Sequence, residues 1–499
     1  MTTHARYVHR LLIPLVFPCG LAPGAGKDGG NLLVLSRDGQ GRPVLRGTAI
    51  AGALRQAWAR KHGYDASSRG HDKEVARWFG YALGDDDGEG SEHRNLPSPL
   101  RLADALLEAG LQDAERRHHN AIDRHSGAAR DGGLFAIEML PPGTSAVLVL
   151  NLHVGDDSGA KDFLAELVGL VAAGLLFGGH GARGIGSAQL DGNALWRRFD
   201  LTDLDDCAAW LDQSWAWRTG DTPAPSGDAL PPAEDPKALR VSVELAIPRG
   251  QDICIGSGMG EEFPVEPQQV TAVDGRRYWR LPGSSLRGVF RAWVARLAAR
   301  DSRTCKRAPP ADSVTRFTDN GRKSATGDDV GWLFHDRETR MANVRDLASG
   351  ELDLDEVVAC PVADLFGSLY NAGRIHISDA IADQPVGGTG DGTHGHQSQH
   401  RRHVAVDRIT GGANEGFLFD HAALLPGPRF RTEIIIQEAQ TQDAEWLIAT
   451  LRALDLGLIR VGSSKSSGRL SLAAPPTATG PDGLVKIVQN LQPSEVCHG

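Results

Sequence analysis

The chain has 499 residues, of which 41% are hydrophobic and 23% charged, and its formal net charge is −10 at neutral pH. Because this length is too great for one ordinary core, we expect two domains or more. The acidic balance excludes a global basic field, so any RNA or DNA site must be local. Six cysteines without a Cys-x-x-Cys pair indicate a reducing compartment, and the sequence shows no membrane segment, so we expect a cytoplasmic protein.

A strand, a glycine-rich loop and a helix are predicted near the N-terminus. Residues Tyr7–Phe17 are typical of a first strand, and the loop at 23–30 precedes a second one. The segment 45–58 begins with a glycine turn and continues as an amphipathic helix. Such a helix start presents backbone N–H groups and the positive end of the helix dipole, so it is a candidate phosphate site.

The same order of elements returns in the second half of the chain. Its members are a strand at 239–248, a glycine-rich loop at 256–260, a strand at 277–281 and an amphipathic helix at 286–297. The two serines that follow Gly283 are good N-caps for this helix. Gly47 and Arg55 align with Gly283 and Arg291 at one constant spacing.

Later motifs also repeat in order. They are an Asp-Arg pair (123–124 and 407–408), a strand (145–154 and 430–437) and a closing loop rich in glycine or serine (178–186 and 461–469). The spacing aligns Gly184 with Gly468, and the two aspartates of the Asp-Arg pairs are expected to be structural. This ordered recurrence indicates two units that derive from one ancestral domain.

The predicted layout is a first domain at 1–200, a linker at 201–237, a second domain at 238–475 and a C-terminal tail at 476–499. The polar, glycine-rich runs at 300–345 and 384–402 are expected to be flexible loops or protruding fingers. The order of strands and helices within each unit is that of the ferredoxin-like fold with insertions. We therefore predict an α+β protein of two tandem ferredoxin-like domains, which is also the frame of RNA-recognition domains.

The motifs resemble those of the RAMP superfamily, in particular the backbone subunits of type III CRISPR effector complexes. The resemblance rests on residues 281–288, 360–368, 373–380, 406–411 and 462–468, with weaker versions at 123–127 and 178–186. It implies a tandem fusion of two RAMP domains, as in the type III-D and III-E lineages. The implied partners are the guide RNA (crRNA), the target RNA and other effector subunits, and no membrane.

The resemblance further implies that each unit holds guide RNA by its phosphates and sugars, through groups that do not read sequence. The expected RNA-binding residues are Gly47, Thr48, Arg55, Gly179 and Arg183 in the first half, and Gly283, Ser284, Ser285, Arg287, Arg291, Ser463, Lys465 and Ser466 in the second. A thumb-like hairpin from the long insertion would kink the guide–target duplex at regular intervals.

In this family an aspartate of the first glycine-rich loop supports metal-dependent cleavage of target RNA. The implied catalytic residue and ligand of Mg²⁺, or of another divalent ion, is Asp28, although the family's spacing back from Gly47 falls nearer Asn31. In the second half the corresponding candidate is Glu266, whose extra methylene moves the carboxylate.

A zinc site is a further possibility in the second half, since some relatives carry zinc knuckles. Its candidate ligands are His394, His396, His400 and His403, with Cys305 or Cys360 from elsewhere in the chain. Two other functions stay open. One is a scaffold that binds crRNA without cleaving RNA, and the other is a free-standing metal-dependent RNA-processing enzyme.

Overall fold

The computed structural model describes residues 5–27, 32–64, 73–80, 96–110, 114–122, 129–179, 181–211, 227–233, 237–256, 266–300, 361–367, 372–387, 398–406, 410, 412–462 and 467–494. The chain divides into two compact units. Unit 1 consists of Met1–Pro236 with Gln269–Trp279, and unit 2 consists of Lys237–Gln268 with Arg280–Gly499. Both are mixed α+β units with mainly antiparallel sheets, as the sequence predicts.

Unit 1 is built on a sheet with the strand order β12-β11-β1-β9-β6-β4. The strands are β1 (Tyr7–Phe17), β4 (Val44–Leu45), β6 (Ala105–Glu108), β9 (Thr144–Val154), β11 (Ala194–Asp200) and β12 (Asp228–Leu230), with β5 (Leu100–Leu102) beside β9 and β10 (Gln189–Leu190) beside β1. The central strand β1 pairs antiparallel with β9 from Tyr7↔Val154 to Phe17↔Thr144. The bounds of β1 are those predicted from the sequence.

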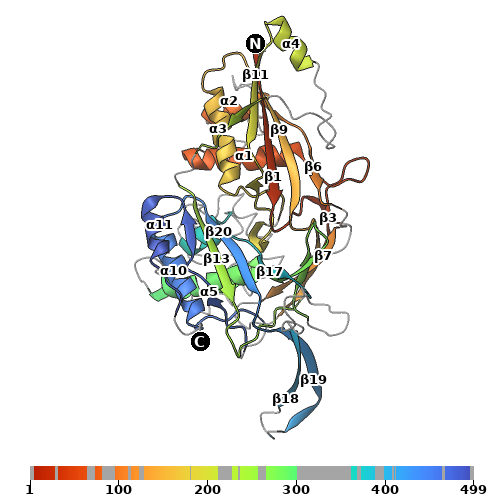
Figure 1. Ribbon diagram of the computed structural model, residues 1–499, viewed down its shortest axis with the longest axis vertical. Coiled ribbons are helices and arrows are strands. Elements are labelled where there is room, and N and C mark those ends of the chain that lie inside the picture. The colour runs from red at the N-terminus through yellow and green to blue at the C-terminus, as the bar shows by residue number, and fades with distance from the viewer. Residues whose placement is uncertain are drawn as a thin grey trace, which may run out of the picture. The chain divides into compact units, whose positions relative to one another are not determined.

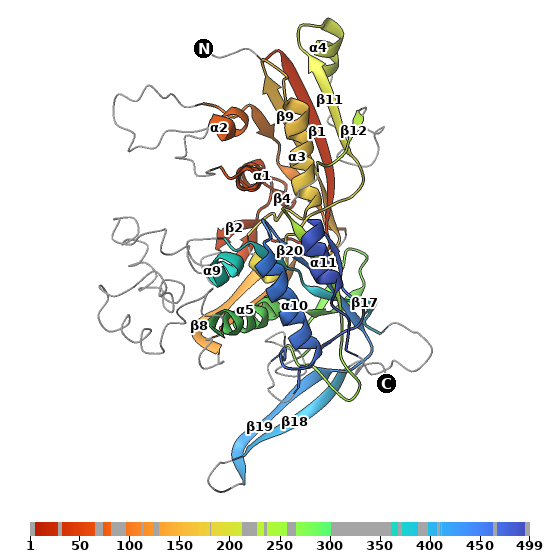
Figure 2. The same cartoon turned by 90° about the vertical axis from the view of Figure 1, so that its left-hand side faces the viewer.

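Three helices cover one face of this sheet (Figures 1 and 2). They are α1 (Gly47–His62), α2 (Lys73–Phe79) and α3 (Ala160–Ala172). Side chains alternate between the faces of a strand, and Leu11, Ile13 and Leu15 of β1 are fully buried in the core with residues of all three helices. The intervening residues of β1, among them Arg10, belong to the opposite face.

A second sheet of unit 1 has the order β2-β3-β8-β7. Its strands are β2 (Gly24–Lys27), β3 (Leu32–Leu35), β7 (Glu115–Ile122) and β8 (Ala129–Met139). β7 and β8 form an antiparallel hairpin, while β3 pairs parallel with β8 and antiparallel with β2. A bridge between Leu21 and Leu140 connects the end of the hairpin to the segment that follows β1.

In the sheet of unit 2, β13 lies between β20 and β21, and β17 pairs with β20. In addition, β16 pairs with β20, and β22 pairs with β13. The strands are β13 (Leu239–Ala246), β16 (Ile375–Ile377), β17 (Ala380–Pro385), β20 (Arg429–Ile436), β21 (Ser471–Leu472) and β22 (Thr477–Thr479), and the hairpin of β14 (Gln269–Thr271) and β15 (Arg277–Leu281) lies between β13 and the first helix in sequence. The helices are α5 (Gly283–Arg300), α9 (Pro361–Phe366), α10 (Thr441–Asp455) and α11 (Asp482–Gln489). Leu239, Val241 and Val243 of β13 are fully buried, which gives this sheet one apolar face.

A hairpin of β18 (Ser398–Val406) and β19 (Ala413–Leu424) projects from unit 2 (Figures 1 and 2). The sequence predicts a loop or finger over 384–402, but the described residues of this run lie largely in β17 and β18. The finger is therefore a regular antiparallel hairpin. The other predicted insertion, at 300–345, lies outside the described residues except for its first residue.

The predicted linker and tail both contain regular structure. Within 201–237, the helix α4 (Leu204–Leu211) packs against β11, and β12 pairs with β11. Within 476–499, β22 pairs with β13, and α11 packs against α10. Among the residues that the structure describes, none of the helices has both the length and the apolar character that a membrane span requires.

Candidate nucleic-acid interface

The closing loop of unit 1, residues 178–186, is fixed by two backbone hydrogen bonds. The Phe177 N–H donates to Gly186 O at 2.8 Å, which brings the two ends of the loop together. The Gly186 N–H donates in turn to Gly20 O at 2.9 Å, just beyond the end of β1. The loop is therefore held against the chain that leaves the central strand.

The closing loop of unit 2, residues 462–468, has the same two bonds. The Val461 N–H donates to Gly468 O at 2.9 Å, and the Gly468 N–H donates to Asp252 O at 2.8 Å. Asp252 follows β13 as Gly20 follows β1, so the two units hold their loops in the same way.

These bonds correct the alignment of the two loops. The spacing predicts that Gly184 corresponds to Gly468, but the residue of unit 1 that makes the bonds of Gly468 is Gly186. Because the span from Gly462 to Gly468 is two residues shorter than that from Gly178 to Gly186, a constant spacing selects the wrong glycine.

Close backbone contact requires a glycine at the start of each loop. Gly178 has a φ of +77°, and a Cβ there would lie 2.8 Å from Ala22 O. Gly462 has a φ of +119°, and a Cβ there would lie 2.5 Å from Cys254 O. A side chain would collide with backbone and would also be strained by the left-handed φ. The glycines thus let each loop lie directly on the segment that follows the first strand of its own unit.

Each unit also has a hairpin with the same cross-strand pairs. In β7–β8, His119 pairs with Phe135, and in β18–β19, His403 pairs with Phe419. Both hairpins have a shift of register just beyond this pair. An isolated bridge connects each hairpin to the segment after the first strand of its unit. The hairpins are therefore equivalent parts of the repeated unit, and each one starts beside a closing loop.

The first strand of each hairpin is basic, and this was missed in the sequence. The residues are Arg116, Arg117, His118 and His119 in β7, and His400, Arg401, Arg402 and His403 in β18. Both runs stand at the same distance before the repeated Asp-Arg pair, which was the signal that could have revealed them. The sequence indicates the two histidines of β18, His400 and His403, only as candidate zinc ligands.

Both hairpins expose an aliphatic side chain in the equivalent cross-strand pair, on the second strand in unit 1 and on the first strand in unit 2. Leu134, which pairs with Asn120, is 53% exposed, and Val404, which pairs with Leu418, is 46% exposed. Since an exposed apolar residue at one register position recurs in both units, the position is a candidate for contact with a ligand.

Arg183, a predicted RNA contact, lies against the hairpin of unit 1. Its guanidinium is 4.3 Å from the centroid of the Phe135 ring, and that ring stacks on His119 with centroids 5.3 Å apart. Burial and the charge of Arg117 lower the pKa of Arg183 to about 10. Arg183 therefore stays protonated at neutral pH, and the closing loop and the hairpin bring two guanidiniums together with two rings.

Lys27 lies in the same row of this sheet as Arg117. Across the four strands, Lys27 pairs with Leu33, Leu33 pairs with Ile137, and Ile137 pairs with Arg117. Directly paired residues project from the same face of a sheet, so the two basic residues share one face. The candidate catalytic residue Asp28 follows Lys27 in the chain and lies outside the described residues.

At the predicted phosphate sites, each helix start is bonded to a carboxylate of its own unit. The Gly47 N–H donates to Asp104 Oδ1 at 2.8 Å, and the Gly283 N–H donates to Asp379 Oδ1 at 2.7 Å. Both aspartates are the fifth residue of a stretch that recurs in the two halves, Leu100–Ala105 and Ile375–Ala380, and their position at the helix starts is not evident from the sequence. A carboxylate at this place satisfies the helix dipole and opposes a phosphate there.

The serines and the threonine at these helix starts lie in the first turns. α5 begins at Gly283, so Ser284 and Ser285 are not N-caps, and the Ser285 N–H donates to Pro282 O at 2.9 Å. Thr48 is exposed in the first turn of α1.

The helix arginines bond to the short helices of their own units. Arg55 Nη1 donates to Gly80 O at 3.3 Å, and Arg287 donates to Phe366 O. Burial and the charge of Arg291 lower the pKa of Arg287 to about 10. These contacts position α2 and α9, so Arg55 and Arg287 have a structural role whether or not they also contact RNA.

The remaining predicted site residues divide into described and undescribed positions. Gly179 lies in an exposed part of its closing loop with open space around its Cβ position, and Glu266 is half-buried before β14. The predicted positions outside the described residues are Asp28, Ser463, Lys465, Ser466, His394, His396, Cys305 and Cys360. Within the described ranges no three His, Cys, Asp or Glu side chains are grouped so as to hold a metal ion.

Comparison with known proteins agrees with this duplicated organisation. A family model described as the RAMP superfamily matches residues 11–189 and 250–470. The two matched regions lie one in each half of the chain and together cover most of it. A search of curated proteins found no match.

Proposed function

The chain belongs to the RAMP superfamily, which includes CRISPR crRNA-binding subunits, and we propose that it is a backbone subunit of a type III effector complex. In this proposal each unit binds one segment of guide RNA. The observation that carries it is the duplicated pair of a pinned closing loop and an adjoining basic hairpin.

The chemistry of the pair suits a guide of any sequence. Backbone amides of a glycine-rich loop contact phosphate without reading bases. In unit 1, Arg183 and Lys27 add positive charge where the acidic body of the protein would otherwise repel RNA. Phe135 offers a ring beside Arg183, as is typical of surfaces that bind single-stranded RNA.

The hairpins are the candidates for the thumb that kinks the guide–target duplex. The exposed Leu134 and Val404 belong to the equivalent cross-strand pair of the two hairpins, Leu134 on the second strand of its hairpin and Val404 on the first strand of its own. An apolar side chain that enters between bases unstacks them, and two such side chains on tandem units would do so at a regular interval.

We further propose that Asp28 supports cleavage of target RNA in unit 1. It follows Lys27 in the chain, and Lys27 shares one face of the β2-β3-β8-β7 sheet with Arg117. The carboxylate would hold a divalent ion together with the RNA's own phosphates, or orient the attacking 2′-hydroxyl. When bound, Mg²⁺ stabilises the charge that develops on the phosphate.

Two measurements on the full chain test these proposals separately. For binding, the protein is purified with co-expressed crRNA, and we expect Arg183→Gln with Lys27→Gln to lower the crRNA content at least several-fold. For cleavage, complementary target RNA is added, and we expect Asp28→Asn to abolish a subset of the cuts while crRNA binding stays unchanged. Asp38→Asn, in an exposed turn bonded to Arg42, is the matched control. Unchanged cutting at every position would remove Asp28 from the mechanism and leave the binding proposal intact.

A further inference from the structure

The face of the unit-1 sheet opposite α1–α3 carries three arginines in one line. The register pairs Arg101 with Asn151, Asn151 with Arg10, and Arg10 with Arg197. Directly paired residues share a face, and neighbouring strands are about 4.8 Å apart. The line therefore runs across β5, β9, β1 and β11 over about 14 Å, and we name Arg101, Arg10 and Arg197 the arginine row.

Arg10, at the centre of the row, is held in place by neighbouring side chains. Its Nε donates to Asn151 Oδ1 at 3.1 Å, and its guanidinium is 4.8 Å from the ring centroid of Trp210 in α4. Burial and the charge of Arg197 lower its pKa to about 10. It stays protonated at neutral pH, and its position is fixed before any ligand arrives, which reduces the entropy lost on binding.

Aromatic rings stand beside the row. The ring of Trp210 makes edge contacts with His153 at 5.8 Å and with Phe199 at 5.5 Å between centroids. Arg197 lies over Phe199, 4.6 Å from its centroid. Burial and the charge of Arg101 lower the pKa of His153 to about 4, so this ring is neutral at physiological pH. Guanidiniums and rings thus alternate on this face.

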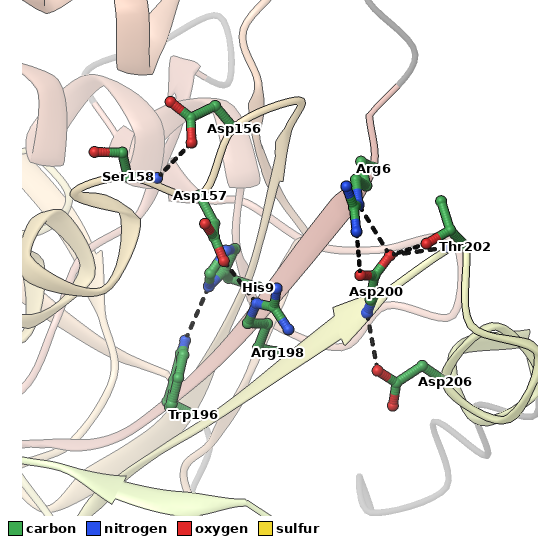
Figure 3. A network of polar contacts seen from close by, with 10 residues as sticks. All are labelled: Arg6, His9, Asp156, Asp157, Ser158, Trp196, Arg198, Asp200, Thr202 and Asp206. Atoms are coloured by element: carbon green, nitrogen blue, oxygen red, sulfur yellow. Dashed lines mark hydrogen bonds and ion pairs between the residues drawn. The ribbon is translucent and has the colours of Figure 1, made fainter.

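Arginines on the other face, at the same end of the sheet, are paired with carboxylates. Figure 3 shows Arg198 bonded to Asp157 at 2.7 Å and Arg6 bonded to Asp200 at 3.1 Å. Those pairs are largely neutralised within the protein. In the arginine row, by contrast, Arg10 pairs in register directly with Arg197, and Arg101 and Arg10 both pair with Asn151.

The described strands of unit 2 do not repeat the row. The counterpart of Arg10, counted back from the closing-loop contacts, is Ser242, which pairs with Glu433 on one side and Thr477 on the other. Glu433 in turn accepts a hydrogen bond from Arg240 at 2.6 Å. We name the closing loop and the hairpin of each unit the shared grip. Because the shared grip is duplicated and the arginine row is not, the row has a different role.

We infer that the arginine row of unit 1 is a second RNA-binding surface, which binds the phosphates of a single strand that crosses the face of the sheet opposite α1–α3, beside Trp210. Planar guanidiniums bind phosphate through two donors, and rings beside them stack on bases or sugars. The inference goes beyond the proposed function, since it concerns different residues and a strand other than the one held by the loops and hairpins.

The test uses the full chain already loaded with crRNA, so that the shared grip is filled. A fluorescein-labelled oligouridylate of about 20 nucleotides, not complementary to the guide, is titrated by anisotropy at several KCl concentrations. Arg101→Gln with Arg197→Gln removes the two ends of the row and spares Arg10. The matched control, Arg240→Gln with Arg431→Gln, removes two arginines from the same face of unit 2.

We expect the unit-1 double variant to bind the probe at least tenfold more weakly, and the slope of log affinity against log salt to fall by about 1.4, for two lost phosphate contacts. The control should bind like the wild type. Equal affinity of the unit-1 variant and the wild type would overturn the inference, as would an equal loss in the control. Retained RNA binding with lost binding of polyglutamate would also overturn it, because the row would then be a site for an acidic protein.

Failure of the proposed function is distinguishable from failure of this inference. If no crRNA co-purifies, the proposed function fails, and the same titration on the RNA-free chain still compares the two double variants. The crRNA content and the melting temperature of each variant verify that the fold and the shared grip are intact.

Discussion

The carboxylate of Asp379 accepts a hydrogen bond from the Gly283 N–H, at 2.7 Å, in the first turn of α5. Asp379 is 1% exposed, and Arg280, which is 4% exposed, lies 3.9 Å from it. The same bond in unit 1 joins Asp104 to Gly47, but the side chain of Asp104 is 46% exposed. The same hydrogen bond is therefore made by a buried carboxylate in unit 2 and by a solvent-exposed carboxylate in unit 1.

This difference predicts unequal costs for the two carboxylates. Asp379→Ala leaves a buried arginine and an unsatisfied helix start, so it should lower the free energy of unfolding by about 3–5 kcal/mol. Asp104→Ala removes an exposed cap and should cost about 1 kcal/mol. Urea denaturation of the full chain, followed by tryptophan fluorescence, measures both. Equal costs would contradict the burial argument.

The closing loops should tolerate no side chain at their glycines. In Gly468→Ala the new Cβ would lie 2.1 Å from Val461 O at a φ of +89°. We expect this variant to lose about 1–3 kcal/mol of stability and to retain less guide RNA. Gly288→Ala in α5 meets open space and should gain about 0.5–1 kcal/mol. The loop has no role in binding if a folded Gly468→Ala protein retains its full RNA content.

Two arginines with the same lowered pKa should behave differently. Arg183 lies on the hairpin ring, and Arg287 bonds to the backbone of α9, yet burial and a neighbouring arginine lower the pKa of each to about 10. Arg183→Gln should weaken RNA binding several-fold with little change in melting temperature. Arg287→Gln should lower the melting temperature by several degrees, because the Phe366 carbonyl loses its donor. Calorimetry and RNA content measured on the same samples separate the two roles, and the assignment fails if the effects are exchanged.

The stability of unit 1 should fall in mild acid through His9. His9 Nδ1 accepts a hydrogen bond from Trp196 at 3.3 Å, and burial lowers the pKa of His9 from 6.5 to about 4 (Figure 3). Below pH 6.5 the unfolded chain takes up a proton that the folded chain does not, so stability is lost as the pH falls from about 6.5 towards 4. The variant His9→Phe cannot take up this proton, so it serves as the control.

The unfolding free energy of the wild type should therefore fall by about 2 kcal/mol more than that of His9→Phe between pH 7 and pH 5. Urea titrations at the two pH values measure this difference. An identical pH dependence of the two proteins would show that His9 is not the titrating group.

Local patterning was sufficient to predict much of the fold. The apolar run that forms β1 and the residues that form β15 have the bounds that the sequence indicates, because strong alternation and adjacent turn residues define them. The closing loops were recognised as repeated features, since glycine is required wherever backbones touch. Only the pairing of their glycines was wrong, as Gly186 shows, because hydrogen bonds and not spacing define equivalence.

Other features depend on contacts that sequence spacing does not express. Asp104 and Asp379 contact the helix starts because distant segments of the chain pack together. The sequence does not show this contact, because an aspartate in a repeated motif can have several structural roles. The arginine row is invisible in sequence, because Arg10, Arg101 and Arg197 come from separate strands and meet only through register. The short β22 and α11 fell in a segment whose composition resembles a tail.

The central claim is that two equivalent units each hold a segment of one guide RNA. Nuclease protection of the RNA bound to the purified full chain tests it most directly, with the wild type beside Gly178→Asp, which disrupts the closing loop of unit 1, and Gly462→Asp, which disrupts that of unit 2. We predict that each variant protects about half the length protected by the wild type, and that the double variant protects none. A chain that retains no RNA, or a protected length that neither variant changes, would contradict the account.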